Sequence, residues 1–277
     1  MLFLEVLVVM RGGGDLATGV ALRLKRAGFP LIVLELSRPL VVRRTVALAS
    51  AVLLGTVEVE GIHGTLVNSS GEALAMARQE ATVPVLVDPE GQSLPALQPK
   101  VVVDARMAKR NLDTTPDQAP LVVALGPGFE AGRDCHAVVE TNRGHFLGRV
   151  YWQGHAEPNT GTPGPVAGYR AERVLRAPVD GIVRAFADIG DAVVADQIVA
   201  EVGGVPVRAP FAGVVRGLIA DGTPVQAGLK IGDVDPRGRR DHCFTVSDKA
   251  LAVGGGVLEA VLTWLNRCTP TRRTPCI

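Results

Sequence analysis

The stretch Arg11–Pro30, RGGGDLATGVALRLKRAGFP, carries the strongest fold signal in the chain. It follows an apolar run and opens an amphipathic segment, so it predicts a strand, a glycine turn and a helix over residues 16–27. Gly12, Gly14 and Ala17 satisfy the dinucleotide fingerprint G-x-G-x-x-A in that context. Glycine lets the backbone approach a pyrophosphate closely, and the helix N-terminus supplies free N–H groups. The stretch predicts a nucleotide site, with a purely structural turn as the alternative.

Charged residues around this turn fit both interpretations. Glu35 ends the next predicted strand, 21 residues after Gly14, where an acid accepts from a ribose hydroxyl. Arg43 and Arg44 can meet a second phosphate, whereas Asp15 can cap the N–H groups that a phosphate would use. The predicted cofactor-binding residues are Gly12, Gly13, Gly14, Asp15, Glu35, Arg43, Arg44, Gly126 and Gly128.

Apolar runs and amphipathic stretches alternate through the first half of the chain. Strands are predicted at residues 5–10, 31–36, 83–87, 100–104, 121–125 and 137–140, and a further helix at 73–80. Continuous apolar strands separated by helices are typical of a parallel sheet covered on both faces. The sequence therefore predicts a Rossmann-like nucleotide- or cofactor-binding domain over residues 1–155, followed by a glycine- and proline-rich linker at 154–168.

An internal repeat follows the linker. Residues 176–200, RAPVDGIVRAFADIGDAVVADQIVA, align without a gap with residues 208–232, RAPFAGVVRGLIADGTPVQAGLKIG, at an offset of 32. Such self-similarity marks a duplicated unit of short strands and glycine turns. The pattern resembles the biotinyl/lipoyl barrel-sandwich domain. The predicted fold class is α/β: a Rossmann-like parallel sheet, a small all-β barrel-sandwich module at 171–236, and a C-terminal helix at 244–266 that packs on the first domain.

The hairpin between the two repeats lacks a carrier residue. In carrier members of the biotinyl/lipoyl fold, a lysine at this hairpin takes the prosthetic group. Here residues 201–208, EVGGVPVR, place Gly203 and Gly204 at the tip, and no lysine lies between the two halves. We therefore expect no biotin and no lipoate, and a rigid accessory module that packs on the first domain or presents a docking surface.

Three residues are candidates for catalysis. Asp104 and Lys109 follow the strand at 100–104, so they emerge at the carboxyl edge where doubly wound folds place ligands. His145 lies in the dense stretch ETNRGHFLGR, and histidine is the residue type most often used as a general acid or base. Each has an ordinary alternative, a solvated loop for Asp104 and Lys109 and a structural histidine for His145. Gly126 and Gly128 follow another strand and can bring N–H groups to an anion, or simply form a turn.

Composition excludes several classes of function. With 29 Lys and Arg against 28 Asp and Glu, the net charge of +1 provides no field for a polyanion, and aromatic residues make up only 4%. We therefore expect no nucleic-acid partner. No apolar run approaches the roughly 20 residues of a spanning helix, so we expect no membrane partner. Four cysteines without metal or disulfide spacing predict no metal site and a cytoplasmic protein.

The motifs together resemble one known family. The strings RGGGDLATGVALRLKRAGFP, VVVDARMAKRN, ALGPGF, ETNRGHFLGRV, PNTGTPG, VGGVPVRAPFAGVVRGL and SDKALAVGGGVLEA resemble the YqeB family, from about Val8 to Leu262. Its members accompany selenium-dependent molybdenum hydroxylases and are regarded as accessory or maturation factors. The resemblance brings no defined reaction and no assigned catalytic residue.

We therefore expect an accessory factor in the maturation of a selenium-dependent molybdenum hydroxylase. It would bind a nucleotide, NAD(P) or similar, or a molybdopterin-type cofactor through the glycine loop, and its partner would be the hydroxylase or another maturation factor. Two alternatives stay open, an NAD(P)-dependent oxidoreductase with Glu35 on the ribose and a binding scaffold without chemistry. The ligand, the reaction and the oligomeric state do not follow from the sequence.

Overall fold

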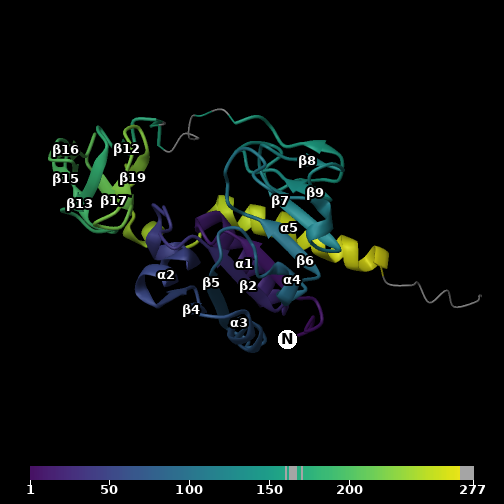
Figure 1. Ribbon diagram of the computed structural model, residues 1–277. Helices are drawn as coiled ribbons and strands as arrows, with labels where there is room; N and C mark the ends of the chain where they lie inside the picture. Colours follow the sequence, from purple (N-terminus) through teal and green to yellow (C-terminus); the bar gives the residue numbers. More distant parts are fainter. Residues whose placement is uncertain (160, 162–166, 170, 269–277) are drawn as a thin grey trace, which may run out of the picture.

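A nine-stranded sheet organises the larger part of the chain in this computed structural model, which describes residues 1–159, 161, 167–169 and 171–268 (Figure 1). Its strands are β1 (Val8–Arg11), β2 (Leu31–Glu35), β3 (Thr56–Val59), β4 (Ile62–Val67), β5 (Thr82–Val87), β6 (Val101–Asp104), β7 (Leu121–Leu125), β9 (Ala137–Val139) and β10 (Val150–Tyr151). They lie in the order β10-β9-β7-β6-β1-β2-β5-β4-β3. We call this part, with the helices packed on it, the sheet domain.

The predicted fold class was wrong. Neighbouring strands from β9 to β4 pair in parallel, but β3 pairs antiparallel with β4 and β10 pairs antiparallel with β9, so the sheet is mixed and not a parallel Rossmann sheet. The strands β3 and β4 were not predicted. A two-residue turn joins them at Glu60 and Gly61, which both have the positive φ that such a hairpin turn requires. In place of the barrel-sandwich module predicted at 171–236, the strands of that region form two separate four-stranded antiparallel sheets.

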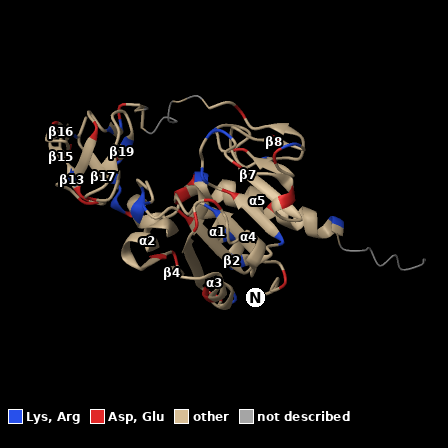
Figure 2. Cartoon of the chain, viewed as in Figure 1, with Lys and Arg blue, Asp and Glu red and all other residues tan. Residues whose placement is uncertain are grey.

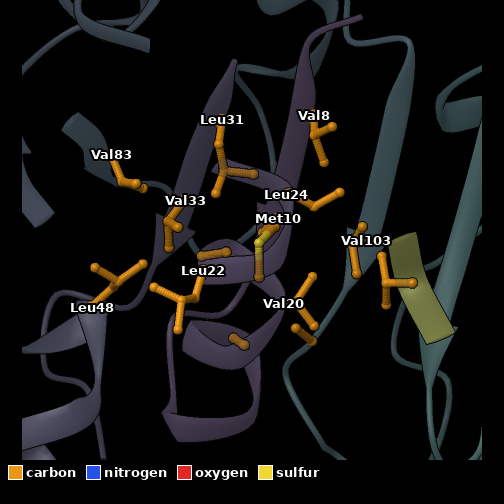
Figure 3. Close-up of a cluster of buried hydrophobic side chains, with 14 of the residues drawn as sticks. Val8, Met10, Val20, Leu22, Leu24, Leu31, Val33, Leu48, Val83 and Val103 are labelled. Atoms are coloured by element: carbon orange, nitrogen blue, oxygen red, sulfur yellow. The ribbon is translucent and has the colours of Figure 1, made fainter. Parts of the chain in front are cut away.

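Helices cover both faces of the sheet because its central strands are apolar on both sides. Val8 and Met10 of β1 join the core beneath α1 (Asp15–Ala27) and α5 (Asp248–Cys268), as Figure 3 shows for Val8, Met10 and the α1 residues Val20, Leu22 and Leu24. Val9 points to the opposite core, which contains residues of α3 (Ser70–Ala77) and α4 (Leu94–Leu97). A short helix, α2 (Ala51–Leu54), lies beside β3 and β4.

Glycines bring α1 and α5 together. A Cβ added at Gly19 would overlap the backbone of Ala250, and one added at Gly254 would overlap the backbone of Gly19. At Gly256 an added Cβ would overlap the carbonyl oxygen of Gly148, whereas at Gly255 it would meet open space. Two of the three glycines inside α5 therefore permit backbone contact, which offsets their low helix propensity.

The repeat forms two four-stranded antiparallel sheets, which we call the small module. Its strands are β12 (Val174–Arg176), β13 (Gly181–Ala185), β14 (Ala192–Val193), β15 (Ile198–Val202), β16 (Val205–Arg208), β17 (Gly213–Leu218), β18 (Pro224–Val225) and β19 (Lys230–Asp235). The sheet orders are β12-β19-β17-β14 and β16-β15-β13-β18, so each sheet combines strands of both repeats. The starts of β13 and β17, of β14 and β18, and of β15 and β19 keep the offset of 32 residues.

One segment of the sheet domain attaches the small module. The N–H of Leu218 donates to the carbonyl of Val42 (2.9 Å), and Nε of Arg44 donates to the carbonyl of Leu218 (2.7 Å). The hydroxyl of Thr45 donates to the carbonyl of Cys243 (2.6 Å). These bonds fix the end of β17 and the turn at Cys243 against the segment that precedes α2.

The remaining described elements are short. β8 (Glu130–Ala131) pairs antiparallel with β11 (Gly154–His155), and 3₁₀ turns occur at Arg44–Val46, Leu48–Ser50, Pro116–Gln118 and Arg240–Cys243.

No helix among the described residues is long and apolar enough to cross a membrane. The domain boundaries given above stay predictions, and part of the 154–168 linker lies outside the described residues.

Candidate functional site: a basic cleft between the sheet domain and the small module

A cleft of about 600 Å³ lies between the sheet domain and the small module. Its charged lining residues are Asp15, Arg43, Lys109, Arg143, Glu157 and Lys249 from the sheet domain and Arg173, Arg176, Arg216, Lys230 and Asp233 from the small module. Blue segments lie on both sides of this junction in Figure 2. Eight cations against three carboxylates give the cleft a positive potential, although the whole chain is nearly neutral. Such a cleft is suited to an anionic ligand.

Lysines concentrate in this cleft. The chain has five lysines, and Lys109, Lys230 and Lys249 all line it. None of these three forms a hydrogen bond or an ion pair with another residue that the structure describes. Burial lowers the pKa of both Lys230 and Lys249 from the ordinary lysine value. Desolvated ammonium groups without partners are costly, and a bound anion would remove that cost.

Two arginines in the cleft are held close together without a shared carboxylate. Burial lowers the pKa of Arg216, and the neighbouring charge of Arg43 lowers it further. Asp235 lies 3.8 Å from Nε of Arg216, but Asp235 is already bound at 2.6 Å by Arg237. The Nε atoms of Arg43 and Arg216 are both buried without a hydrogen-bond partner. The positive charge of the two arginines is therefore only partly compensated, by long ion pairs with Asp235 and Asp15.

The carboxylates of the cleft differ in what they bind. Asp233 accepts from Arg173 at 2.5 and 2.7 Å, and Glu157 accepts from the amide of Asn142 at 2.6 Å. Asp15 has no hydrogen bond among the described residues, and its nearest cation is Arg43 at 3.6 Å. Asp15 is therefore the carboxylate of the cleft that remains available to a ligand.

Two helices begin at the cleft. α1 starts at Asp15, and its N-cap Gly14 provides no side-chain cap. α5 starts at Asp248 after Ser247, whose hydroxyl accepts from the N–H of Ala250 (3.2 Å). Both N-termini carry partial positive charge that adds to the field of the basic side chains.

The structure brings three of the predicted site residues into the cleft: Asp15, Arg43 and Lys109. Gly126 and Gly128 flank Pro127, which also lines it. A Cβ at Gly126 would overlap the side chain of Thr141, and one at Gly128 would overlap the backbone that joins Lys109 to Arg110. The contacts of these two glycines are thus to segments that line the cleft.

The glycine turn before α1 contacts its own chain. Glu35 accepts from the N–H of Gly13 (2.8 Å) and from that of Leu36 (2.6 Å), and burial raises the pKa of Glu35. A Cβ at Gly12 would press on the backbone of Ala105, and a Cβ at Gly13 on that of Ala49. Gly14 faces space, with Val41 as its nearest neighbour at 4.0 Å. Arg44 binds Leu218, as described above, outside the cleft.

The other two catalytic candidates, Asp104 and His145, are not among the residues that line the cleft. Asp104 is buried and accepts from Arg106 (2.6 Å) and from the hydroxyl of Thr114 (2.6 Å). His145 is exposed, and its ring lies edge-on to that of Phe146. No group of three or more His, Cys, Asp and Glu side chains within the described ranges is arranged to hold a metal ion.

Sequence reasoning missed Arg173, Lys230 and Lys249 as site residues. Two features of the sequence could have pointed to the lysines. The chain has only five lysines, and Lys230 replaces the apolar Ile198 at the equivalent position of the first repeat. Arg216 aligns with Arg184, which is 70% exposed and lies outside the cleft, whereas Arg216 is only 12% exposed. The second copy of the repeat therefore contributes Arg216 and Lys230 to the cleft, beside Arg173 and Arg176 from the start of the small module.

Comparison with known proteins finds one close sequence likeness. No family model matches the chain. It is 51% identical over 261 residues, 94% of its length, to the uncharacterized protein YqeB of Escherichia coli (strain K12). The chain is therefore similar to YqeB over nearly all of its length. It spans about half of the YqeB sequence, 48%. This likeness supports the YqeB-family resemblance and says nothing of a role in hydroxylase maturation.

Two solved structures show a weak likeness. An aspartoacylase family protein from Mesorhizobium loti MAFF303099 has 13% identity and a TM-score of 0.28, covering 84% of this chain and 86% of that one. The ectoine utilization protein EutE (DoeB) from Ruegeria pomeroyi has 13% identity and a TM-score of 0.24, covering 83% and 85%. At these scores neither likeness bears on fold or chemistry.

Proposed function

We propose that this chain binds a phosphate-bearing small molecule, a nucleotide or a molybdopterin-type cofactor, in the basic cleft. The observation that supports this is the excess of cations there, with Lys109, Lys230 and Lys249 unpartnered among the described residues. Phosphate oxygens accept charge-assisted hydrogen bonds from such groups, and a helix N-terminus favours them further. The start of α1 reaches the cleft at Asp15, so the ligand would lie beside the glycine turn.

The biological setting of this proposal comes from the resemblance to the YqeB family. We propose that the bound molecule serves the maturation of a selenium-dependent molybdenum hydroxylase and that the client or another maturation factor is the protein partner. A cytoplasmic location is part of the proposal, because Cys135 and Cys243 are buried and free.

Calorimetry on the purified protein tests the ligand proposal. The panel is NAD, NADP, ATP, CTP, FAD and molybdopterin with its dinucleotide forms. Lys249→Met should weaken binding of the active compound by about tenfold, the loss expected when one charged phosphate contact is removed. Lys100→Met is the matched control, since Lys100 is exposed and outside the cleft.

The outcomes separate the alternatives. Binding that falls in Lys249→Met and persists in Lys100→Met supports the cleft. Equal binding by both variants would place the ligand outside the cleft. If no compound of the panel binds, the proposed phosphate site is wrong and the non-catalytic scaffold is favoured. Hydride transfer to or from NADP or NAD with a small substrate would favour the oxidoreductase instead.

A further inference from the structure

The cations of the cleft fall into two neighbouring groups, one on the sheet domain and one on the small module. The Lys249 ammonium interacts with the charges of Asp15, Arg143, Glu140 and Asp248. The Lys230 ammonium interacts with those of Asp233, Arg173, Asp15 and Arg216. Asp15 belongs to both sets, and Asp248 of the first set also interacts with Arg216 of the second. The surroundings of the two lysines therefore differ, and they meet near Asp15.

Each group belongs to a different wall of the cleft. Lys249 is on the first turn of α5, and Arg143 is fixed beside it by two bonds of 2.7 Å to Asp248. Lys230 opens β19, and Arg216 is on β17 of the small module. The first group also has the N-termini of α1 and α5 next to it, whereas the second consists of side chains alone. We call them the helix wall and the module wall.

Asp15 decides what can lie between the walls. Its carboxylate has no hydrogen bond among the described residues, so it can accept one from a ligand hydroxyl or N–H group. A phosphate placed directly opposite it would be repelled. Two anionic groups joined by an uncharged, hydroxyl-bearing segment satisfy both walls and Asp15 together.

We propose that the ligand is a nucleotide whose ribose carries a second phosphate, with the 5′-phosphate on the helix wall, the 2′- or 3′-phosphate on the module wall, and the remaining ribose hydroxyl donating to Asp15. This inference rests on the proposed function and narrows its ligand class. The helix wall takes the 5′-phosphate because helix N-termini present N–H groups to the phosphate that leads into the rest of a nucleotide. The module wall, with Lys230, Arg173 and Arg216, takes the 2′- or 3′-phosphate, which is a terminal phosphomonoester in every ligand of this class.

Pairs of compounds that differ by one phosphate test the inference by calorimetry. Adenosine 2′,5′-bisphosphate and adenosine 3′,5′-bisphosphate are compared with 5′-AMP, and NADP with NAD. We expect at least one bisphosphate to bind about tenfold more tightly than 5′-AMP. Lys230→Met should bring that ratio close to one, whereas Lys249→Met should weaken both members of a pair equally. Lys100→Met and Arg184→Met are controls that should leave the ratio unchanged.

The variant Asp15→Ala tests the proposed hydrogen bond between Asp15 and the ribose hydroxyl. Asp15→Ala should strengthen binding of inorganic pyrophosphate, which has no hydroxyl to donate, and weaken binding of the bisphosphate nucleotide. A change in the same direction for both compounds would show that Asp15 acts only as a countercharge. Circular dichroism of each variant establishes that the fold is intact.

The result can separate this inference from the proposal on which it rests. Equal binding of 5′-AMP and both bisphosphates, weakened by Lys249→Met, would overturn the second-phosphate inference and leave the phosphate cleft standing. Tighter binding of pyrophosphate than of either bisphosphate would also overturn it. No binding of any phosphate compound would remove both.

Discussion

Replacing Arg216 by Met should stabilise the unliganded protein and at the same time weaken its binding of anions. Arg216 is 12% exposed, its Nε has no hydrogen-bond partner, and its contact with Asp235 is 3.8 Å long. An unpaired buried polar group costs about 1–3 kcal/mol. Asp235 keeps its bonds to Arg237 when Arg216 is removed, so no new orphan carboxylate arises.

The expected gain in unfolding free energy is about 1 kcal/mol, since the lost attraction to Asp235 offsets part of the relieved burial cost. A gain of that size raises the melting temperature by roughly 2–4 °C in a chain of this length. Methionine keeps the apolar stem that packs in the wall. Removing the positive charge also removes its repulsion of Arg43.

The repeat provides the matched control for this prediction. Arg184 occupies the equivalent position of the first copy and also has a 3.8 Å ion pair, with Glu201, but it is 70% exposed. Arg184→Met should change the unfolding free energy by no more than about 0.5 kcal/mol. Denaturant unfolding monitored by circular dichroism gives the stabilities, and calorimetry with pyrophosphate gives the affinities. Destabilisation by Arg216→Met of more than about 1 kcal/mol would show a structural arginine and refute the reasoning.

Three further predictions address the helices and the lysines. Gly14→Val should fold normally, because space surrounds Gly14, and loss of phosphate binding on calorimetry would place the ligand at the glycine turn. Gly254→Ala should destabilise the protein by about 1–3 kcal/mol through overlap with the backbone of α1, whereas Gly255→Ala, which meets open space, should stabilise it by up to about 1 kcal/mol in denaturant unfolding. Finally, because burial lowers the pKa of Lys249 in the folded state, the unfolded chain binds more protons, so stability should rise with pH between that lowered pKa and the ordinary lysine value. Phosphate affinity should fall over the same range as the lysine loses its charge. Lys249→Met should reduce both slopes in pH-dependent melts and calorimetry, with the remainder due to other buried lysines such as Lys230, and an unchanged slope would exclude a contribution from Lys249.

Local patterns predicted most of the individual elements. The strands at residues 31–36 and 121–125 were confirmed to within one residue, and the helix predicted at 16–27 begins at Asp15. These elements have a periodicity that is visible within a short window of sequence. The hairpin of β3 and β4 was missed although its turn at Glu60 and Gly61 is equally local. Because the antiparallel strand β10 was missed as well, the sheet was predicted to be parallel.

The candidate site could not be assembled from sequence alone. Asp15, Lys109 and Lys249 come from distant stretches of the chain that the sheet domain brings together, and the docking of the small module on residues 42–45 adds Arg216. The glycine turn has a recognisable pattern, but the sequence does not tell whether its N–H groups meet a ligand or a side chain. In the structure the N–H of Gly13 meets Glu35.

The position of α5 along the chain has a consequence for the order of folding. The last strand of the small module, β19, ends at Asp235, before α5 begins at Asp248. During synthesis the module can therefore form its own core while α1 still exposes the surface that Ala250 and Gly254 later cover. The sheet domain is completed last, by a helix that reaches it after the module has emerged from the ribosome. A nascent chain arrested before α5 should thus hold a folded small module beside an unfinished sheet domain, sensitive to protease.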